Sequence, residues 1–416
     1  MSELFSQTTF CVRPWTHLQL KNNGKLRFCC DAQPGNIVSS DGRHLSAENV
    51  SIEDIRNSPN MNRVRAQMLA GEKPVECKKC WETELNGGKS LRQKENAAWS
   101  QSPTDKVNVR SIELRLGNSC NLRCRMCGPG NSNKWYEDYL SLTGSSSFRE
   151  DETEYDFLKD ADLFTWHENP ETINRLFSLS PELSEIQFVG GEPFMSKSHL
   201  PLLKKLIASK EASKISLRYT TNLTLLSDDF FQLWSHFKEV TISVSIDGMG
   251  SVFEYIRTPA VWEQVVHNLH RIDREIGRSV ARVSIQPTPN IYNIFQLVEL
   301  SQWTLQTLRK VGWTAHLNFQ EGPSWQSAYI LTPSYKIEVM ESFNQYGKKL
   351  SLEEAHDPRI SRIISWFESL SSRLALKNWT YLQKEFKIKN ERLDQIRQQS
   401  LLSAIPEVYN AIFTEF

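Results

Sequence analysis

Beyond residue 106, short apolar runs alternate with longer stretches that repeat their apolar positions at helical spacing. The runs cover residues 111–116, 185–189, 215–220, 240–246, 282–286 and 314–319. Apolar runs separated by amphipathic helical segments are typical of parallel βα units. The pattern predicts an α/β fold whose six strands fit a partial (β/α)6 barrel. In such barrels the functional groups gather at the C-terminal ends of the strands.

The N-terminal third has a different pattern. Apolar and polar residues alternate over 15–20, a turn sequence occupies 22–24, and 25–28 forms a return arm. We therefore expect a β-hairpin. Residues 51–54 form a capping box that opens a short helix, and residues 59–70 carry apolar positions at helical spacing.

Two segments lie outside these patterns. Residues 135–181 form an insertion rich in acidic and aromatic residues, which we expect to be an exposed acidic helix, with a substrate lid as the alternative. From residue 331 to 416 apolar positions recur at helical spacing, as in Ile360, Ile363 and Phe367. This predicts a helical extension that covers the barrel or the N-terminal region, or that recognises a partner.

Charge and composition exclude some classes of function. The 416 residues contain 49 Lys and Arg against 49 Asp and Glu, so no overall field favours nucleic acid or an anionic membrane. The start of the chain lacks the features of a secretory signal, and no apolar run approaches the roughly 20 residues that span a bilayer. We expect a cytoplasmic protein without a membrane or nucleic-acid partner.

The cysteines are concentrated in the first third of the chain. All eight precede residue 128, which indicates local metal sites rather than a disulfide framework. Cys120, Cys124 and Cys127 follow the first predicted strand of the barrel with the spacing CxxxCxxC. Three thiolates leave one iron of a [4Fe-4S] cluster open, whereas a structural zinc site would need a fourth ligand.

A second group of cysteines lies nearer the N-terminus. Cys11, either Cys29 or Cys30, and the CxxC pair Cys77 and Cys80 supply four thiols. A [4Fe-4S] cluster and a four-cysteine zinc site are both compatible with this set. Cys30 could be a spare buried thiol, an alternate ligand or a hydrogen-atom donor.

Polar and glycine-containing segments end the second, third and fourth predicted strands. They are Gly190, Gly191, Glu192 and Pro193 after the second strand, Thr220 and Asn222 at the third, and Ser245 and Asp247 at the fourth. Paired glycines let a backbone approach a ligand closely, and a carboxylate can accept from an ammonium group.

The three-cysteine loop and the Gly-Gly-Glu-Pro turn together resemble the radical S-adenosylmethionine (radical SAM) superfamily. The resemblance implies that S-adenosylmethionine binds the open iron through its amine and carboxylate. It further implies contacts to this cofactor from residues of the loop, the strand ends and a following helix. These residues are Met126, Gly190, Gly191, Glu192, Pro193, Thr220, Asn222, Ser245, Asp247 and Arg257.

The order Cys11, Gly24, Cys29 resembles the opening of SPASM and twitch domains, which hold an auxiliary [4Fe-4S] cluster. In most relatives this domain follows the barrel, whereas here it precedes it. The expected division is a SPASM/twitch-like domain over 1–105, a radical SAM barrel over 106–330 and a helical extension over 331–416.

The resemblance implies an enzyme that reductively cleaves S-adenosylmethionine and abstracts a hydrogen atom from its substrate. A fully ligated auxiliary cluster favours oxidation or crosslinking, and substrates of such relatives are often peptides or proteins. Dehydrogenation or epimerisation of a small sugar-like molecule is the alternative, and a zinc-stabilised binding protein is the non-enzyme alternative. The expected electron donor is a flavodoxin or a ferredoxin.

Overall fold

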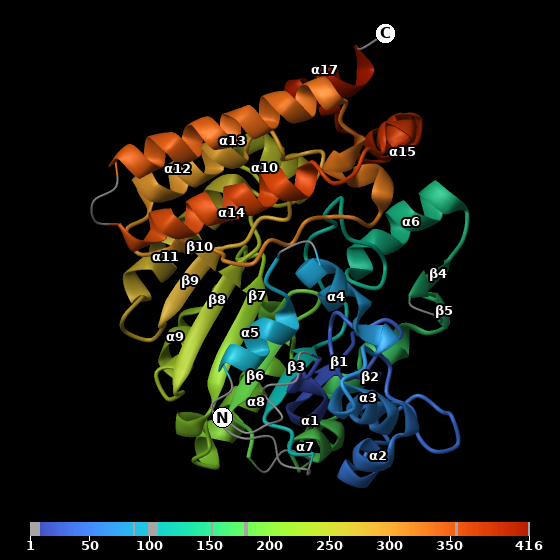
Figure 1. Ribbon diagram of the computed structural model, residues 1–416. Coiled ribbons are helices and arrows are strands. Elements are labelled where there is room, and N and C mark those ends of the chain that lie inside the picture. Colours follow the sequence, from blue (N-terminus) through green and yellow to red (C-terminus); the bar gives the residue numbers. More distant parts are fainter. Residues whose placement is uncertain are drawn as a thin grey trace. The chain divides into compact units, whose positions relative to one another are not determined.

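The structure is a computed structural model that describes residues 9–85, 88–98, 107–150, 153–178, 182–353 and 357–414 (Figure 1). The chain divides into two compact units. The first contains residues 1–119, 147–219 and 236–239, and the second contains residues 120–146, 220–235 and 240–416. Each unit is described by itself.

The first unit is built on strands in the order β2, β1, β3, β6, β7. Their bounds are β1 His17–Leu20, β2 Leu26–Arg27, β3 Ser111–Arg115, β6 Glu185–Val189 and β7 Ser216–Thr221. Strands β1 and β2 pair antiparallel, and the pairs β1–β3, β3–β6 and β6–β7 are parallel. Alternate residues such as Ile112 and Leu114 are buried in the apolar core.

The predicted N-terminal hairpin is confirmed, with one correction to its start. Gly24 has a φ of +75° in the turn between β1 and β2, and its N–H donates to the carbonyl of Lys21 at 2.9 Å. The segment Arg13–Thr16 is a short helix, α1, rather than strand, because Pro14 begins a helical turn well and the sheet partner Ser111 first meets His17.

The first unit contains further helices among its described residues. They are α2 Ile52–Asn57, α3 Pro59–Leu69, α4 Lys78–Leu85, α5 Leu91–Ala98, α7 Pro170–Ser178 and α8 His199–Ala208. The capping box is confirmed at α2, where Ser51 and Asp54 exchange hydrogen bonds. Helix α3 buries Met61, Val64 and Met68. Both helices therefore lie where the sequence pattern predicts them.

The insertion does not form the expected acidic helix. Residues 151–152 and 179–181 of that prediction lie outside the described residues. On either side of the first gap, β4 Ser147–Glu150 and β5 Thr153–Asp156 pair antiparallel. Phe148 and Tyr155 face each other across this hairpin with ring centroids 5.7 Å apart, and both are buried. Burial of these two aromatic rings on one face favours strands over a helix.

The second unit contains strands β8 Glu239–Val244, β9 Arg282–Ile285 and β10 Gly312–Trp313, which pair in parallel in that order. The sixth predicted strand, 314–319, is wrong. The strand found there, β10, lies just before the predicted one. Its last residue, Trp313, pairs with Ile285, where the partner strand β9 ends, and within the described residues β9 offers no further residue for pairing beyond Thr314. The helices between the strands are α9 Asp228–Trp234, α10 Gly250–Ile256, α11 Trp262–Glu275 and α12 Leu297–Thr307.

The remaining helices confirm the predicted C-terminal helical extension. They are α13 Pro333–Glu353, α14 Pro358–Leu374, α15 Gln383–Arg397, α16 Leu401–Ala404 and α17 Pro406–Phe413, while α6 Tyr136–Thr143 lies earlier in the chain. Helices α13 and α14 run side by side (Figure 1). Helix α14 buries the face that carries Ile363, Phe367 and Leu370. Fold class and helical extension therefore follow the apolar pattern.

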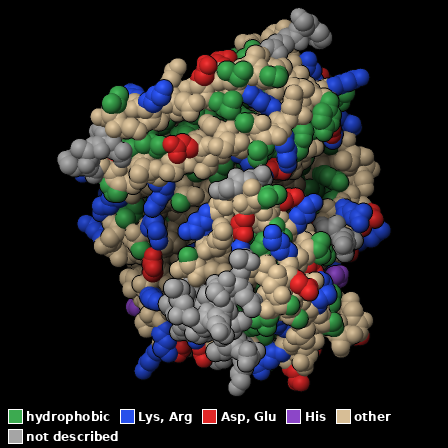
Figure 2. All heavy atoms as spheres, viewed as in Figure 1, with side chains coloured by type: hydrophobic (Ala, Val, Ile, Leu, Met, Phe, Trp, Pro, Cys, Tyr) green, Lys and Arg blue, Asp and Glu red, His purple; other side chains and the backbone are tan. Residues whose placement is uncertain are grey.

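Two surface properties bear on function. Within the described residues no helix is long and apolar enough to cross a bilayer. Lys and Arg side chains are spread over the face seen in Figure 2, with Asp and Glu among them. This agrees with the balanced charge of the sequence.

A buried carboxylate fixes the loop that leads into β10. Asp273 accepts hydrogen bonds from the backbone N–H groups of Arg309, Lys310 and Val311 at 3.2, 2.8 and 2.8 Å. We expect Asp273→Asn to lower the free energy of unfolding by about 1–3 kcal/mol, because the neutral amide accepts these bonds less well. Denaturant titration measures this change. An unchanged unfolding midpoint would contradict the role given to Asp273.

Candidate functional site

Four cysteines of the first unit surround one cavity. Cys11, Cys29, Cys77 and Cys80 line a cavity of about 360 Å³, a volume that includes space open to solvent. Cys11 precedes α1 and Cys29 follows β2, so the hairpin brings two distant thiols together. Cys77 ends a 3-10 turn and Cys80 lies in the first turn of α4, which places the CxxC pair on one side of the cavity.

The lining of the cavity combines apolar side chains with the charged residues Arg13, Asp31 and Arg92. Phe28, Met68 and Leu91 contribute to the lining of the cavity. Burial raises the pKa of Cys11 and of Cys77 to about 12, so both are protonated near neutral pH in the absence of metal. Iron must therefore displace protons on binding.

The cavity distinguishes between the neighbouring cysteines Cys29 and Cys30, which are alternative candidates for one ligand. Cys29 lines it, whereas Cys30 is not among its lining residues. A hydrogen bond with Cys29, together with burial, raises the pKa of Cys30 well above its usual value. Four thiols around one cavity fit the ligand set of a [4Fe-4S] cluster. In the described part of the chain, no group of three or more His, Cys, Asp or Glu side chains is arranged to hold a single metal ion.

The three-cysteine loop belongs to the second unit, and its thiols have polar neighbours. The backbone N–H of Leu122 lies 3.4 Å from Sγ of Cys120, and Nδ2 of Asn222 lies 3.9 Å from the same sulfur. The N–H of Cys127 donates to the carbonyl of Cys124 at 2.9 Å. Cys120 and Cys124 are buried and Cys127 is half-buried. The loop therefore turns its third thiol toward a more open position.

A charged pair lies directly beside this loop. Nη1 of Arg257 is 3.7 Å from Sγ of Cys124, and Nη2 of Arg257 is 2.6 Å from Oδ2 of Asp247. Asp247 is fully buried and also accepts from the N–H of Thr288 at 2.7 Å. A hydrogen bond from Cys127, opposed by burial and helped by Arg257, lowers the pKa of Cys124 to about 7. The surroundings of Cys124 therefore favour its thiolate, the form that binds iron, whereas the same hydrogen bond and burial raise the pKa of Cys127 well above its usual value.

Asn222 belongs to a small polar network at the end of β7. Its Nδ2 donates to Oδ1 of Asn121 at 3.0 Å, and Nδ2 of Asn121 donates to Oγ1 of Thr224 at 2.7 Å. The N–H of Ser245 donates to the carbonyl of Thr221 at 2.8 Å, and both residues belong to the second unit. Thr220 and Ser245 are half-buried there, and Met126 is half-buried on the loop.

The Gly-Gly-Glu-Pro turn lies in the first unit, against the residue that precedes the loop. The N–H of Glu192 donates to the carbonyl of Ser119 at 2.8 Å, and Ser119 is bonded to Cys120. Gly190 and Gly191 have φ values of +78° and +51°. A Cβ at Gly191 would clash with the Ser119 carbonyl. The glycines are therefore required for the close approach of the turn.

Sequence reasoning missed His199, which supports this turn. Its Nδ1 lies 3.0 Å from the carbonyl of Pro193 and its Nε2 lies 3.0 Å from the hydroxyl of Tyr219. The carbonyl can only accept, so Nδ1 carries the proton and Nε2 accepts from Tyr219. The sequence could have suggested this role, because His199 follows Pro193 by six residues and begins α8.

The loop has two further supports that the sequence analysis missed. Nε1 of Trp135 donates to the carbonyl of Cys124 at 2.8 Å, and Oγ of Ser132 donates to the carbonyl of Leu122 at 2.6 Å. Within the second unit the structure thus brings Asn222, Asp247 and Arg257 to the three cysteines. In the first unit, the N–H of Glu192 contacts the carbonyl of Ser119 before the loop, and its carboxylate accepts from the N–H of Phe194 at 3.2 Å.

Comparison with known families agrees with this geometry. Residues 114–291 match the family model of the Radical SAM superfamily, and residues 11–81 match that of the SPASM iron-sulfur cluster-binding domain. Residues 114–291 are therefore a radical SAM region, and residues 11–81 are a SPASM region on its N-terminal side, as the sequence predicts. The predicted cofactors, [4Fe-4S] clusters and S-adenosylmethionine, agree with these matches.

Individual relatives are distant. Molybdenum cofactor biosynthesis protein 1 of Dictyostelium discoideum is 24% identical over 264 residues, which are 62% of this chain and 37% of that protein. The solved structure of anSMEcpe with bound AdoMet is 15% identical, with a TM-score of 0.39, over 58% of this chain and 61% of that chain. Streptococcus suis SuiB bound to precursor peptide SuiA is 13% identical, with a TM-score of 0.31, over 70% and 59%. The chain therefore spans just over a third of the curated relative.

Acid should destabilise the support of the Gly-Gly-Glu-Pro turn. Burial lowers the pKa of His199 from 6.5 to about 3, so the folded state binds this proton less well than the unfolded state. His199 therefore contributes stability above pH 6.5 that is lost as the pH falls toward 3. Between pH 7 and 5 the loss is about 2 kcal/mol.

Denaturant titration of the wild type and of His199→Gln at several pH values checks this expectation. Since glutamine does not titrate, the variant should show a shallower fall of unfolding free energy between pH 7 and 5. Parallel slopes for the two proteins would contradict the assignment.

Proposed function

We propose that the chain uses Cys120, Cys124 and Cys127 to hold a [4Fe-4S] cluster with one open iron, and modifies a peptide or protein oxidatively. When bound, the reduced cluster and S-adenosylmethionine supply a 5'-deoxyadenosyl radical that takes a hydrogen atom from the substrate. The observation that carries the proposal is the arginine and carboxylate pair beside Cys124.

Within the second unit, the residues around the loop have separate tasks. Arg257 places a fixed positive charge where the anionic cluster and a carboxylate would bind, and Asp247 fixes the orientation of its guanidinium. Asn222 connects Cys120 to the polar network at the end of β7, because its Nδ2 lies near Sγ of Cys120 and donates to Asn121. Met126, Thr220 and Ser245 stay predicted cofactor contacts by resemblance, as do Gly190, Gly191, Glu192 and Pro193 in the first unit.

The four-cysteine cavity supports a net oxidation. A cluster held by Cys11, Cys29, Cys77 and Cys80 has no open iron, so it can accept an electron but cannot bind substrate. An electron taken from a substrate radical gives an oxidised or crosslinked product. The SPASM resemblance supports a peptide substrate, and a flavodoxin or ferredoxin is the proposed electron donor for the first cluster.

A small-molecule substrate is the second candidate. The sequence match to a molybdenum cofactor biosynthesis protein supports it, because that protein's name points to the assembly of a small cofactor. Incubating reconstituted enzyme with deuterated peptides or deuterated small molecules distinguishes the candidates. Deuterium in 5'-deoxyadenosine from a peptide supports the first candidate, and transfer only from small molecules contradicts it.

Removal of one loop thiol should abolish cofactor cleavage. We expect Cys124→Ala to reduce formation of 5'-deoxyadenosine under dithionite to the background of the protein-free mixture, because two thiolates do not hold the cluster. Chromatography of the reaction measures the nucleoside. The auxiliary site should keep its iron in this variant. Cleavage by Cys124→Ala at the wild-type rate would contradict the proposed ligand set.

The neighbouring cysteines Cys29 and Cys30 give a matched test of the auxiliary site. We expect Cys29→Ala to lose the iron of that site and to lower product formation more than cofactor cleavage, because Cys29 lines the cavity. Cys30→Ala should keep its iron. Iron analysis of the two reconstituted variants measures the difference, and the opposite order of iron content would rule out Cys29 as the ligand.

A further inference from the structure

The two residues that flank Cys124 are both linked to helix α15 by buried charges. On one side, Nη1 of Arg123 lies 2.8 Å from Oδ1 of Asp138, and Oδ2 of Asp138 lies 2.8 Å from Nη2 of Arg397. On the other side, Arg125 forms an ion pair with Asp394. Arg397 and Asp394 are three residues apart on α15, so one face of this helix contacts both sides of the cysteine.

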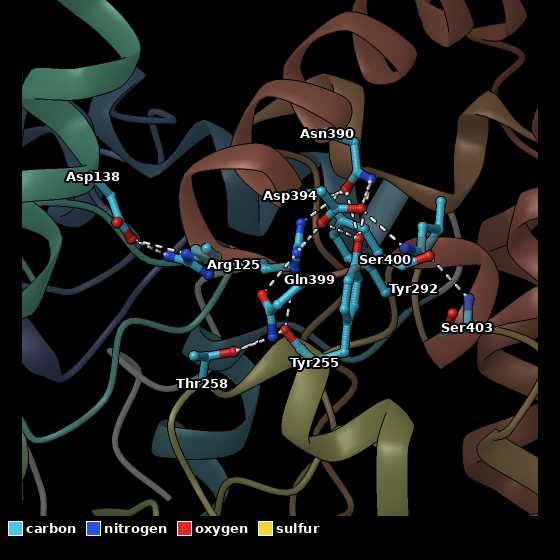
Figure 3. A network of polar contacts seen from close by, with 12 residues as sticks. Arg125, Asp138, Tyr255, Thr258, Tyr292, Asn390, Asp394, Gln399, Ser400 and Ser403 are labelled. Atoms are coloured by element: carbon cyan, nitrogen blue, oxygen red, sulfur yellow. Dashed lines mark hydrogen bonds and ion pairs between the residues drawn. The ribbon is translucent and has the colours of Figure 1, made fainter.

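Arg125 is fixed at nearly every donor. Its guanidinium donates to the carbonyl of Tyr255 at 3.1 Å, to Oδ1 of Asn390 at 2.9 Å and to Oε1 of Gln399 at 3.0 Å. Figure 3 shows these acceptors and Asp394 gathered around the arginine. The guanidinium carbon also lies 3.5 Å from the centroid of the Tyr255 ring. Arg125 is 1% exposed.

The backbone of the same residue is fixed as well. The N–H of Arg125 donates to the carbonyl of Ile256 at 2.8 Å, and its carbonyl accepts from Nε2 of Gln326 at 2.9 Å. A buried ion pair is weak evidence for stability, because desolvation offsets its attraction, and positioning is its better-supported role. The planar guanidinium can hold several acceptors in one orientation only.

We propose that helix α15 is a positioning element for the iron-binding loop. Asp394 acts on Cys124 through Arg125, and Arg397 acts on it through Asp138 and Arg123. The inference rests on the proposed function, because it takes Cys124 as an iron ligand. It also gives the C-terminal helical extension a task at the reaction site, in addition to covering the fold.

The test uses Asp394→Asn in the full chain after anaerobic reconstitution with iron and sulfide. The substitution keeps the size of the side chain and removes the charge that holds Arg125. We expect a smaller electron paramagnetic resonance signal that responds to S-adenosylmethionine, and a changed midpoint potential for that signal. Cofactor cleavage should fall by about 10-fold or more, the usual effect of losing a group that orients a metal ligand.

Conservative substitutions of the arginine refine the test. Arg125→Lys keeps the positive charge, whereas Arg125→Gln does not. Because lysine can still pair with Asp394, we expect Arg125→Lys to retain more of the cofactor-responsive signal than Arg125→Gln. Equal losses in the two variants would overturn the role of the Arg125–Asp394 pair.

Two controls separate positioning from stability. Glu385→Gln removes an exposed charge from the same helix, where Glu385 pairs with Lys389. Asp273→Asn weakens a buried carboxylate whose contacts are with residues 309–311. Both controls should keep the wild-type spectrum and midpoint potential, although the second lowers stability.

Several outcomes contradict the inference. A wild-type spectrum and potential in Asp394→Asn would overturn it, while leaving the proposed function intact. An equal spectral change in Asp273→Asn would also overturn it, because stability alone would then explain the effect. A wild-type protein without any signal that responds to S-adenosylmethionine would overturn the proposed function, and this inference with it.

Discussion

The candidate reaction site depends on one stretch of backbone pairing. The N–H groups of Arg123 and Arg125 donate to the carbonyls of Thr258 and Ile256 at 2.7 and 2.8 Å. Cys124 lies between the two donors and Arg257 lies between the two acceptors. The same pair of hydrogen bonds therefore fixes the path of the loop and places the guanidinium beside the thiol. Asp247 then needs only to orient the arginine.

The thiols that bind iron in the proposed function differ in their individual surroundings. At the four-cysteine cavity, burial raises the pKa of Cys11 and Cys77. At the loop, hydrogen bonding and a nearby arginine lower the pKa of Cys124. A cavity lined by four thiols is appropriate for a fully ligated cluster that would only exchange electrons. A charged and partly open loop is appropriate for a cluster that also binds a zwitterionic molecule.

Much of the fold could be predicted from the sequence because its strands are short, apolar and separated by helical stretches. The prediction failed where the local apolar pattern does not determine whether a segment is a helix or a strand, or where a strand ends. The β4–β5 hairpin depends on burial of Phe148 and Tyr155, and β10 ends where its partner β9 ends. Motif spacing identified the cysteines, and the family resemblance named Asp247 and Arg257 as cofactor contacts, but only the structure shows that these two residues form an ion pair. Motif spacing could not reveal the Arg125 network, whose partner Asp394 is 269 residues away.

The most direct test of the central claim asks whether the cofactor binds the open iron. Electron-nuclear double resonance of the reduced protein with S-adenosylmethionine labelled with ¹⁵N at its amine and ¹⁷O at its carboxylate would measure this. The account predicts hyperfine coupling from both labels to the cluster in the wild type, and none in Cys124→Ala. A reduced cluster without coupling to either label, in a protein that still holds its full iron, would contradict it.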